Sequence, residues 1–397
     1  ATRSRDAFYQ LSVSPAQKRN DFLTVLARLL EKHSDIVFSA NREDLTMAAA
    51  EQLSPPLLHR LTFGEDKLGQ VVRGLNALSA LPDPINKTLM SAEIAESLHL
   101  YRVSCPIGVI GVIFESRPDA LIQISSLCIK SGNAVLLKGG REAVRTNQAL
   151  CDLVRKALAE VSIPIDAVQL LETREDVAQM LKEDRLIDLI IPRGSNQFVS
   201  YIMDHSRIPV LGHSDGICHV YVDRAADPET ACRVVLDSKI QNVSVCNAME
   251  TLLVHRDMAI RFLPEIARRL ADAGVSIRGD SLTQNLISCD PAAESDWTTE
   301  YLDYTLSVKI VASLQEAIDH INQYGSHHTD CIVTEDDWAA AKFMNSVDSA
   351  GVYTNVSTRF ADGFVYGFGA EVGIATGKLH ARGPMGLKEL TSSKYLI

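Results

Sequence analysis

One of the eight cysteines in the chain stands in a setting that suits a nucleophile. Cys246 lies in the stretch QNVSVCNAMETLLVH (Gln241–His255), between polar residues and an apolar run that could begin a helix or a strand. A thiol at the edge of such an element can reach solvent, and backbone N–H groups there can stabilise its thiolate. The residues alone leave a second interpretation open, in which Cys246 is a small side chain packed in a core.

The other cysteines and the histidines predict no further reactive centre. Cys128, Cys151 and Cys232 fall within helical patterns, and Cys218 and Cys331 within strand patterns, so we expect buried, inert thiols there. The scattered spacing is typical of a reducing compartment, and we therefore expect a cytoplasmic protein without disulfides or structural zinc. Two short histidine clusters match no metal-ligand spacing, so we expect no metal site.

Two turns rich in glycine and basic residues could bind phosphate or ribose, although no GxGxxG motif follows any apolar run. The stretch LLKGGREAVRTN places Lys138 at the end of an apolar run, followed by two glycines and Arg141. The stretch IPRGSNQFV places Gly194 and Ser195 at the opening of a helix, whose N–H groups could hold a phosphate. Ordinary solvated turns are the alternative for both stretches.

Short apolar runs alternate with longer helix-compatible segments, and this rhythm predicts the elements that position the candidate residues. The runs are Val109–Phe114, Ala134–Lys138, Ala167–Leu171, Asp188–Pro192 and Ile208–Gly212. Buried strands joined by helical crossovers predict an α/β fold with a doubly wound parallel sheet, in which ligands bind at the carboxyl ends of the strands. A second β/α stretch begins near His219–Asp223.

Length and composition exclude several classes of protein. With 397 residues the chain exceeds one ordinary core, so we expect two or more domains. A hydrophobic content of 46% and a charged content of 22% indicate a well-packed globular protein. A net charge of −11 argues against nucleic acid as a partner, and no apolar run is long enough to span a membrane.

Several longer stretches carry a resemblance to a known family. They are CPIGVIGVIFESRPDAL, SGNAVLLKGGREA, IDLIIPRGSNQF, VCNAMETLLVH and FGAEVGIATGKLHARGPMGL. In this order, over nearly the whole chain, they resemble the γ-glutamyl phosphate reductase (glutamate-5-semialdehyde dehydrogenase) family of the aldehyde dehydrogenase superfamily. They are also similar to the C-terminal half of bifunctional pyrroline-5-carboxylate synthases.

The resemblance implies an aldehyde dehydrogenase-like architecture of three parts. A Rossmann-like cofactor domain would span residues 1–90 and 104–213, and an α/β catalytic domain residues 214–373. An oligomerisation hairpin and tail would span residues 91–103 and 374–397. The resemblance also implies a homo-oligomer, a dimer or a tetramer, with possible functional coupling to glutamate 5-kinase.

The resemblance assigns roles to the candidate residues. Cys246 would be the catalytic nucleophile, Lys138 would contact the adenosine ribose, and Gly194 and Ser195 the pyrophosphate of a dinucleotide bound without the usual glycine-rich loop. Glu300 would hold the nicotinamide ribose.

Arg141 stands where many NAD-using relatives carry a glutamate. A cation there favours a 2′-phosphate, so we expect NADPH as the cofactor.

Two departures from the hydrolytic aldehyde dehydrogenases concern the chemistry. Ser116 stands where those enzymes carry an oxyanion-hole asparagine, and the segment VLGHSDG lacks their general-base glutamate. Without that base, water would be activated poorly, which suits acyl-phosphate chemistry.

Three arginines are candidates for binding the carboxylate and phosphate of the substrate, because a planar guanidinium matches both. They are Arg117, Arg359 and Arg382. Structural salt bridges are the alternative for each.

The expected reaction is the NADPH-dependent reduction of L-glutamyl 5-phosphate to L-glutamate 5-semialdehyde, through a thioester on Cys246 and with release of phosphate, in proline biosynthesis. Another thiol-dependent aldehyde dehydrogenase, using coenzyme A or water as the acyl acceptor, is the nearest alternative. A non-catalytic member of the same fold is an alternative of a different class.

Overall fold

The computed structural model describes residues 1–115, 117–212, 215–368 and 370–397 of the chain. The chain forms two compact units: Ala1–Gly212, Gly367–Ile374 and Pro384–Ile397 make the first, and His213–Tyr366 and Ala375–Gly383 the second. Each unit contains its own parallel sheet with helical crossovers, which confirms the predicted fold class. The functional division into cofactor, catalytic and oligomerisation domains stays a prediction.

The sheet of the first unit has four parallel strands in the order β5-β4-β3-β6. The strands are β3 (Val109–Phe114), β4 (Ala134–Lys138), β5 (Val168–Leu171) and β6 (Leu189–Arg193). The helices between and after them are α6 (Pro118–Lys130), α7 (Val144–Glu160), α8 (Arg174–Met180) and α9 (Asn196–His205). Every residue of β3 and β4 is buried, as expected for strands covered on both faces.

The prediction of a fifth strand over Ile208–Gly212 was wrong. Only Val210 forms a bridge, to Ile190 of β6. Pro209 lacks the N–H that a longer ladder needs, and the N–H of Ile208 is taken by the Ser206 hydroxyl at 3.0 Å. The segment therefore lies beside β6 without extending the sheet.

Five helices precede the sheet and pack on the first unit. They are α1 (Thr2–Ser12), α2 (Ala16–Lys32), α3 (Ser34–Ala50), α4 (Pro55–Leu61) and α5 (Glu65–Ala80). The buried face of α2 carries Phe22, Leu26 and Leu30, spaced at helical intervals, and it packs against α5 and α7.

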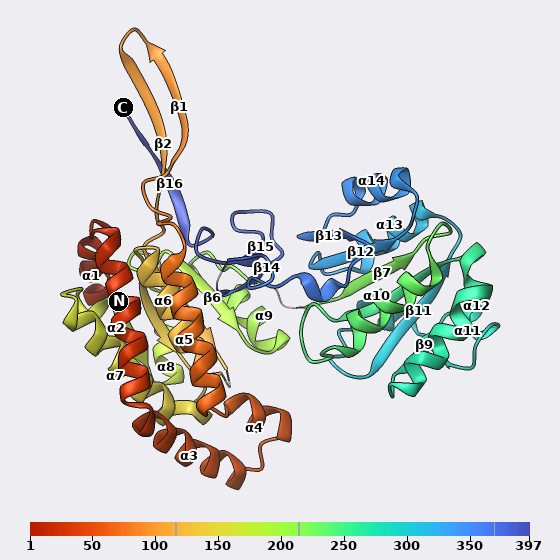
Figure 1. Ribbon diagram of the computed structural model, residues 1–397, viewed down its shortest axis with the longest axis horizontal. Helices are drawn as coiled ribbons and strands as arrows, with labels where there is room; N and C mark the ends of the chain where they lie inside the picture. Colours follow the sequence, from red (N-terminus) through yellow and green to blue (C-terminus); the bar gives the residue numbers. More distant parts are fainter. Residues whose placement is uncertain (116, 213–214, 369) are drawn as a thin grey trace. The chain divides into compact units, whose positions relative to one another are not determined.

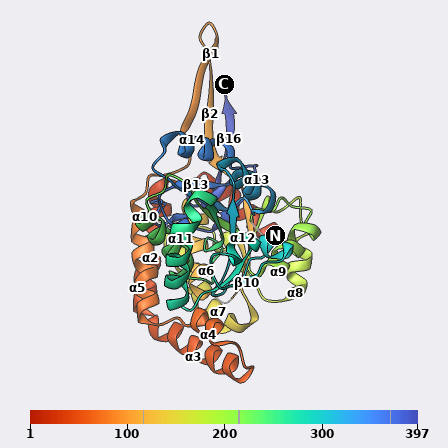
Figure 2. The same ribbon diagram turned by 90° about the vertical axis from the view of Figure 1, so that its right-hand side faces the viewer.

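A β-hairpin extends from the helices of the first unit (Figures 1 and 2). Its strands, β1 (Thr88–Ala95) and β2 (Leu98–Pro106), are antiparallel, and β16 (Thr391–Leu396) pairs along the other edge of β2. All eight residues of β1 are exposed. The three strands therefore form a separate small sheet whose outer edge, on β1, has no strand partner among the described residues.

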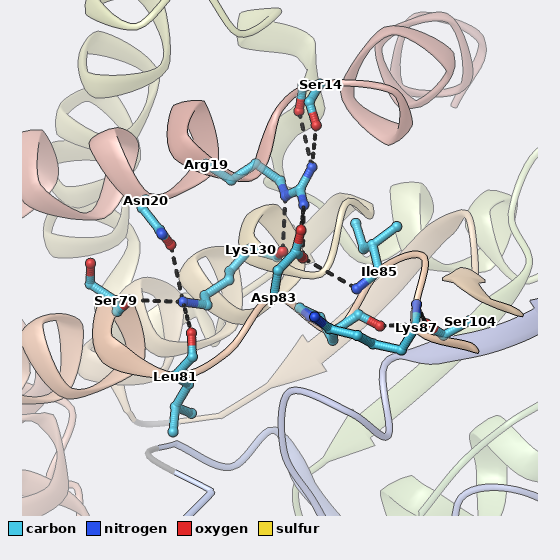
Figure 3. Close-up of polar contacts among 11 residues, drawn as sticks. Ser14, Arg19, Asn20, Ser79, Leu81, Asp83, Ile85, Lys87, Ser104 and Lys130 are labelled. Atoms are coloured by element: carbon cyan, nitrogen blue, oxygen red, sulfur yellow. Dashed lines mark hydrogen bonds and ion pairs between the residues drawn. The ribbon is translucent and has the colours of Figure 1, made fainter. Parts of the chain in front are cut away.

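A polar network ties the helices to the segment that leads into this hairpin (Figure 3). The guanidinium of Arg19 on α2 contacts both carboxylate oxygens of Asp83, at 2.8 and 2.7 Å. The buried ammonium of Lys130, at the end of α6, donates to the carbonyls of Ser79 and Leu81 at 3.0 and 2.7 Å, and its burial lowers the pKa of Lys130 to about 8. Lys130 thus satisfies carbonyls at the C-terminal end of α5, which have no helical partners.

The second unit contains a sheet of seven parallel strands in the order β10-β9-β11-β8-β7-β12-β13. Its strands are β7 (Cys218–Val222), β8 (Met249–His255), β9 (Ser276–Gly279), β10 (Asp290–Pro291), β11 (Thr305–Val311), β12 (Thr329–Val333) and β13 (Gly351–Thr354). Its helices are α10 (Pro228–Ile240), α11 (Arg256–Asp272), α12 (Ser281–Gln284), α13 (Leu314–Tyr324) and α14 (Asp337–Ser346), with 3-10 turns η3 (Glu294–Thr298) and η4 (Thr358–Phe360). The short strands β14 (Gly373–Ala375) and β15 (Gly383–Met385) pair with each other.

Two cores cover the two faces of this sheet. Leu252 and Val254 of β8 belong to the core that includes residues of α10 and α11, whereas Leu253 between them belongs to the core that includes residues of α13 and α14. Successive side chains of a strand point to opposite faces, so a continuous apolar run fills both cores.

The network around Asp83 predicts a difference between two ion pairs on the same helix. Asp83→Ala leaves the Arg19 side chain, only 3% exposed, without its counter-ion, and should lower the free energy of unfolding by about 3 kcal/mol. Arg28→Ala is the control: Arg28 is also on α2 but is 60% exposed where it pairs with Glu160, so its loss should cost less than about 1 kcal/mol. Urea titrations followed by circular dichroism measure both values, and equal losses would contradict the prediction.

Candidate functional site

Lys138 lies at the carboxyl end of β4, between the ends of two neighbouring strands. It pairs in register with Ile113 of β3 and Leu171 of β5. Its side chain is 8% exposed, and its ammonium donates to the carbonyl of Gly139 at 2.5 Å. Hydrogen bonds with Thr173 lower the pKa of Asp176 on α8, and the charge of Lys138 adds to this lowering. A buried ammonium at this edge of the sheet can donate to hydroxyl or phosphate oxygens of a ligand.

Gly194 and Ser195 lie at the same edge, where the strand order reverses between β3 and β6. Gly194 follows β6, and Ser195 is the N-cap of α9. The N–H of Ser195 donates to Glu115, at the end of β3, at 3.3 Å, and a Cβ on Gly194 would lie 2.7 Å from the same carboxylate oxygen. The structure therefore brings Lys138, Gly194 and Ser195 to one edge of the sheet, with Gly194 and Ser195 at its topological switch point.

Arg141 lies in the 3-10 turn η1 (Arg141–Ala143), directly after the glycines that follow Lys138. Its side chain is 77% exposed and pairs with Glu51 of α3 at 3.3 Å. Such a surface pair is weak, so the guanidinium is available to a stronger anion.

Arg117 is exposed and is the N-cap of α6. Burial, together with the charge of Arg117, lowers the pKa of Arg60 on α4. The two guanidinium groups are thus close enough for their charges to interact.

These residues fit a dinucleotide. A buried ammonium, a helix that begins at a glycine and a serine, and an exposed guanidinium supply donors and positive charge for ribose and phosphate groups. Glu115 accepts from the N–H of Ser195 at the start of α9, and its side chain is exposed, so it can leave this N–H to a phosphate. The assignment of each residue to a part of the cofactor stays a prediction.

Cys246 lies in a tight turn that precedes β8. The N–H of Ala248 donates to the carbonyl of Val245 at 3.0 Å, which places Cys246 and Asn247 at the two central positions of the turn. Cys246 is half-buried, so the thiol is neither in the core nor fully in water. This position, at the edge of a buried strand, is the one expected for a reactive thiol.

Backbone and side chains at the start of β7 support the turn from one side. A Cβ on Gly216 would lie 2.1 Å from the carbonyl oxygen of Cys246 and 2.5 Å from its Cα, so the two backbones are in direct contact. The thiol of Cys218 donates to the same carbonyl at 3.3 Å. Burial raises the pKa of Cys218 well above its usual range, so this thiol keeps its proton and remains a donor.

The 3-10 turn η4 supports the Cys246 turn from another direction. The hydroxyl of Thr358 donates to the carbonyl of Asn247 at 2.7 Å, and the amide of Asn247 donates to the carbonyl of Ala361 at 2.9 Å. The neighbouring Arg359 donates to Gln241 at 3.0 Å.

Arg359 is half-buried in the turn that supports Cys246. Burial lowers the pKa of Arg359, and the negative charges of Asp362 and Asp237 act in the opposite direction. The turn η4 thus carries a half-buried cation next to Thr358, which holds the turn of the predicted nucleophile.

Burial raises the pKa of each of the other seven thiols. They are Cys105, Cys128, Cys151, Cys218, Cys232, Cys289 and Cys331. Five of them are buried, as the sequence predicted for those on helices and strands. A raised pKa disfavours the thiolate, so these positions are unsuited to nucleophilic attack.

Glu300 lies in the loop between η3 and β11 and is half-buried. Burial raises the pKa of Glu250 on β8 to about 7, and the nearby charge of Glu300 adds to the rise. Because β8 and β11 are parallel neighbours, the loop of Glu300 and the turn of Cys246 both precede their strands at the amino edge of the sheet. The structure thus brings these two predicted residues to the same edge.

Arg382 is bound by the protein itself. Its guanidinium donates to the carboxylate and to the carbonyl of Asp348, both at 3.1 Å, and Lys378 pairs with the same carboxylate at 2.6 Å. The alternative of a structural salt bridge is therefore realised in this structure, and a role for Arg382 in substrate binding stays a prediction. Ser116, the predicted oxyanion-hole position, lies outside the described residues.

Several residues of these sites were missed by sequence reasoning. Glu115 stands at the end of an apolar run, as Lys138 does. The expectation that ligands bind at the carboxyl ends of the strands could therefore have identified it. Lys239 and Glu250 are buried charges at the two ends of the segment that contains Cys246, and a glutamate inside the apolar run METLLVH was the available signal. The contact of Gly216 with Cys246 joins residues 30 positions apart and left no sign in the sequence.

The described residues contain no cluster suited to a metal ion and no helix suited to crossing a membrane. No group of three His, Cys, Asp or Glu side chains there is arranged to hold a metal ion. No helix in the described parts of the chain has both the length and the apolar character needed to cross a membrane. A cytoplasmic location stays a prediction.

Comparison with known proteins places these sites in a family. The model of the aldehyde dehydrogenase family matches residues 1–285. The gamma-glutamyl phosphate reductase of Acetivibrio thermocellus is 57% identical over 397 residues, which are 100% of this chain and 92% of that protein. The gamma-glutamyl phosphate reductase 1 of Synechocystis sp. is 52% identical, with the same two coverages.

A solved structure agrees with this match. The crystal structure of the gamma-glutamyl phosphate reductase from Thermotoga maritima superimposes with a TM-score of 0.97 at 37% identity, covering 100% of this chain and 96% of that one. The chain belongs to the aldehyde dehydrogenase family of oxidoreductases, and within it to the gamma-glutamyl phosphate reductases. The resemblance found in the sequence is thereby confirmed.

The contact between Gly216 and Cys246 predicts a strong effect of one methyl group. Gly216→Ala forces the backbone of the Cys246 turn to move, and a displacement of about 1 Å at a nucleophile costs about 100-fold in turnover. Gly377→Ala, in the same unit, is the control, because no atom lies within 4 Å of its added Cβ. Steady-state reductase assays of both variants check this; a Gly216→Ala enzyme as active as the control would contradict it.

Proposed function

We propose that the protein reduces L-glutamyl 5-phosphate to L-glutamate 5-semialdehyde with a nicotinamide cofactor, releasing phosphate, as a step of proline biosynthesis. The observation that supports this most directly is the half-buried Cys246 in its braced turn, which the 3-10 turn of Arg359 supports through Thr358. A nucleophile and a cation that can attract a carboxylate or a phosphate are the two groups that this substrate requires.

The first step is attack of the Cys246 thiolate on the acyl carbon of the substrate. The sulfur–carbon bond forms, the bond from carbon to the phosphate oxygen breaks, and phosphate leaves with the electron pair of that bond. The backbone N–H of Cys246, together with a donor near Ser116, would stabilise the oxyanion on the acyl oxygen. Arg359 would hold the anionic substrate beside the thiol, and Arg117 and Arg382 are further candidates for this role.

The second step converts the thioester on Cys246 to the aldehyde. When bound, NADPH supplies the hydride for this reduction. The carbon–sulfur bond then breaks, the semialdehyde leaves and Cys246 is regenerated as a thiolate. As the resemblance implies, Lys138, Gly194, Ser195 and Glu300 would hold the cofactor.

Phosphate, and not water, is the partner of the thioester in this proposal. The segment VLGHSDG contains no carboxylate at the place where hydrolytic relatives carry a general base, so hydrolysis of the thioester is slow. In the reverse direction, phosphate attacks the thioester and regenerates the acyl phosphate. A requirement for phosphate therefore separates this function from the coenzyme A-dependent and hydrolytic alternatives.

We also propose that a second copy of the chain covers the sheet of β1, β2 and β16. Leu89 and Ile94 of β1 are 55% and 50% exposed, and Tyr395 and Leu396 of β16 are 62% and 46% exposed. An open edge strand with exposed apolar side chains is suited to pairing with an identical edge.

An acyl phosphate is labile in water. Coupling of such an oligomer to the glutamate 5-kinase that forms the acyl phosphate would therefore protect the substrate.

Substitution of the nucleophile tests the proposed reaction. Cys246→Ala should abolish the phosphate-dependent oxidation of pyrroline-5-carboxylate by NADP⁺, while the dissociation constant of the cofactor, measured by fluorescence titration, stays within about 3-fold. Cys289→Ala, another half-buried thiol of the second unit, is the control and should keep full activity. Turnover by the Cys246→Ala enzyme near that of the control, or activity independent of phosphate and arsenate, would refute the proposal.

Substitution of Arg141 tests the choice of cofactor. Arg141→Glu removes the cation offered to a 2′-phosphate, so the ratio of kcat/KM for NADP⁺ to that for NAD⁺ should fall about 10-fold or more. Arg145→Glu is the matched control, because Arg145 follows by four positions and is likewise exposed in a surface pair, with Glu43. Equal ratios for the two variants would remove Arg141 as the determinant.

A further inference from the structure

Two buried charges flank the segment that contains Cys246. Lys239 is in the last turn of α10 and Glu250 is the second residue of β8. The Lys239 ammonium lies 2.6 Å from the Glu250 carboxylate, and the two side chains are 0% and 1% exposed. Taking two charges out of water is expensive, and an apolar pair of similar volume stabilises a fold at least as well. Stability alone therefore gives no reason for the pair.

The second carboxylate oxygen of Glu250 reaches the loop of Glu300. It accepts a hydrogen bond from the N–H of Leu302 at 3.2 Å. Leu302 has a φ of 53°, in the left-handed region that a leucine adopts at a cost of about 1–2 kcal/mol. Glu250 thus bonds to α10 with one oxygen and, with the other, holds a strained residue two positions beyond Glu300.

Contacts of Tyr301, the residue between Glu300 and Leu302, fix the same loop. The ring of Tyr301 lies 6.0 Å from the Lys239 ammonium, within the range of a cation–π contact. Its hydroxyl donates to Asp296 at 2.8 Å and contacts Ser307 of β11 at 2.8 Å. The backbone directly after Glu300 is therefore held at two successive residues, and the Lys239–Glu250 pair contacts both.

We infer that the Lys239–Glu250 pair is a positioning device that fixes the loop of Glu300 to α10 and β8, the two elements between which Cys246 lies. The inference rests on the proposed function, in which Cys246 is the nucleophile and Glu300 holds the cofactor. The turn of Cys246 and the loop of Glu300 precede neighbouring parallel strands. The Lys239–Glu250 pair connects them and so sets the spacing of two functional residues. Lys239 and Glu250 act through this loop and touch no reacting atom.

Two double variants separate positioning from packing. Lys239→Met with Glu250→Gln removes both charges but keeps an amide oxygen for the N–H of Leu302. Lys239→Met with Glu250→Leu removes the charges and the acceptor; Glu250→Met replaces the leucine if that variant does not fold. Thermal unfolding followed by circular dichroism establishes that both enzymes are folded, and the exposed-pair variant Glu265→Gln serves as a control for the loss of an ion pair elsewhere in this unit.

Hydrogen exchange and steady-state kinetics are then compared between the two double variants. Relative to the glutamine variant, the leucine variant should exchange the Leu302 amide about 10-fold faster and raise the KM for NADPH about 10-fold, with a smaller change in kcat. The glutamine variant should stay close to wild type in both measurements, as rescue by the conservative replacement. Glu300→Gln provides the reference for direct loss of the cofactor contact.

Each result decides between the inference and the function on which it rests. Equal exchange of the Leu302 amide in the two double variants overturns the inference. Faster exchange with an unchanged KM also overturns it when Glu300→Gln raises the KM. If Glu300→Gln leaves the KM for NADPH unchanged, the assigned role of Glu300 fails. Faster exchange of the Leu302 amide in the leucine variant would still support the Lys239–Glu250 pair as the determinant of the loop's position.

Discussion

The backbone of Cys246 lies against the backbone of Gly216, and the geometry of the second unit's site depends on this contact. Only a glycine allows the approach, and β7 begins two residues later with Cys218, whose thiol binds the same peptide. The turn is thereby fixed to β7 as well as to β8, which it precedes. Arg359 and Glu300 then obtain their positions from η4 and from β11, elements attached to the same sheet.

The two units present their candidate residues at opposite ends of their strands. Lys138 and Gly194 follow β4 and β6, at the carboxyl edge where ligands of open α/β sheets bind. Cys246 and Glu300 precede β8 and β11, at the amino edge. A parallel sheet offers both edges, and the chain uses one in each unit. The expectation that ligands bind at the carboxyl edge therefore pointed to Lys138 and Gly194 but carried no information about Glu300 or the nucleophile.

Local pattern predicted what depends on local physics. The strands Val109–Phe114 and Ala134–Lys138 have the predicted bounds, because continuous apolar runs of this length can only be buried on both faces of a sheet. The run Ile208–Gly212 looked the same by hydropathy, but Pro209 removes the donor that a ladder needs. Cys246 could not be separated from a core cysteine by its neighbours, since its support comes from Gly216 and Thr358, far away in the chain. The resemblance to a family supplied what the local pattern lacked.

The pairing of β16 with β2 has a consequence for synthesis of the protein. Arg102 of β2 donates to Ser393 of β16, a partner 291 positions later in the chain. At a translation rate of about 5–20 residues per second, β2 waits roughly 15 to 60 seconds with this edge open. During that time the nascent hairpin presents an unpaired strand to other nascent chains. The hairpin sheet is therefore among the last parts of the first unit to be completed, because it waits for translation of residues 391–396.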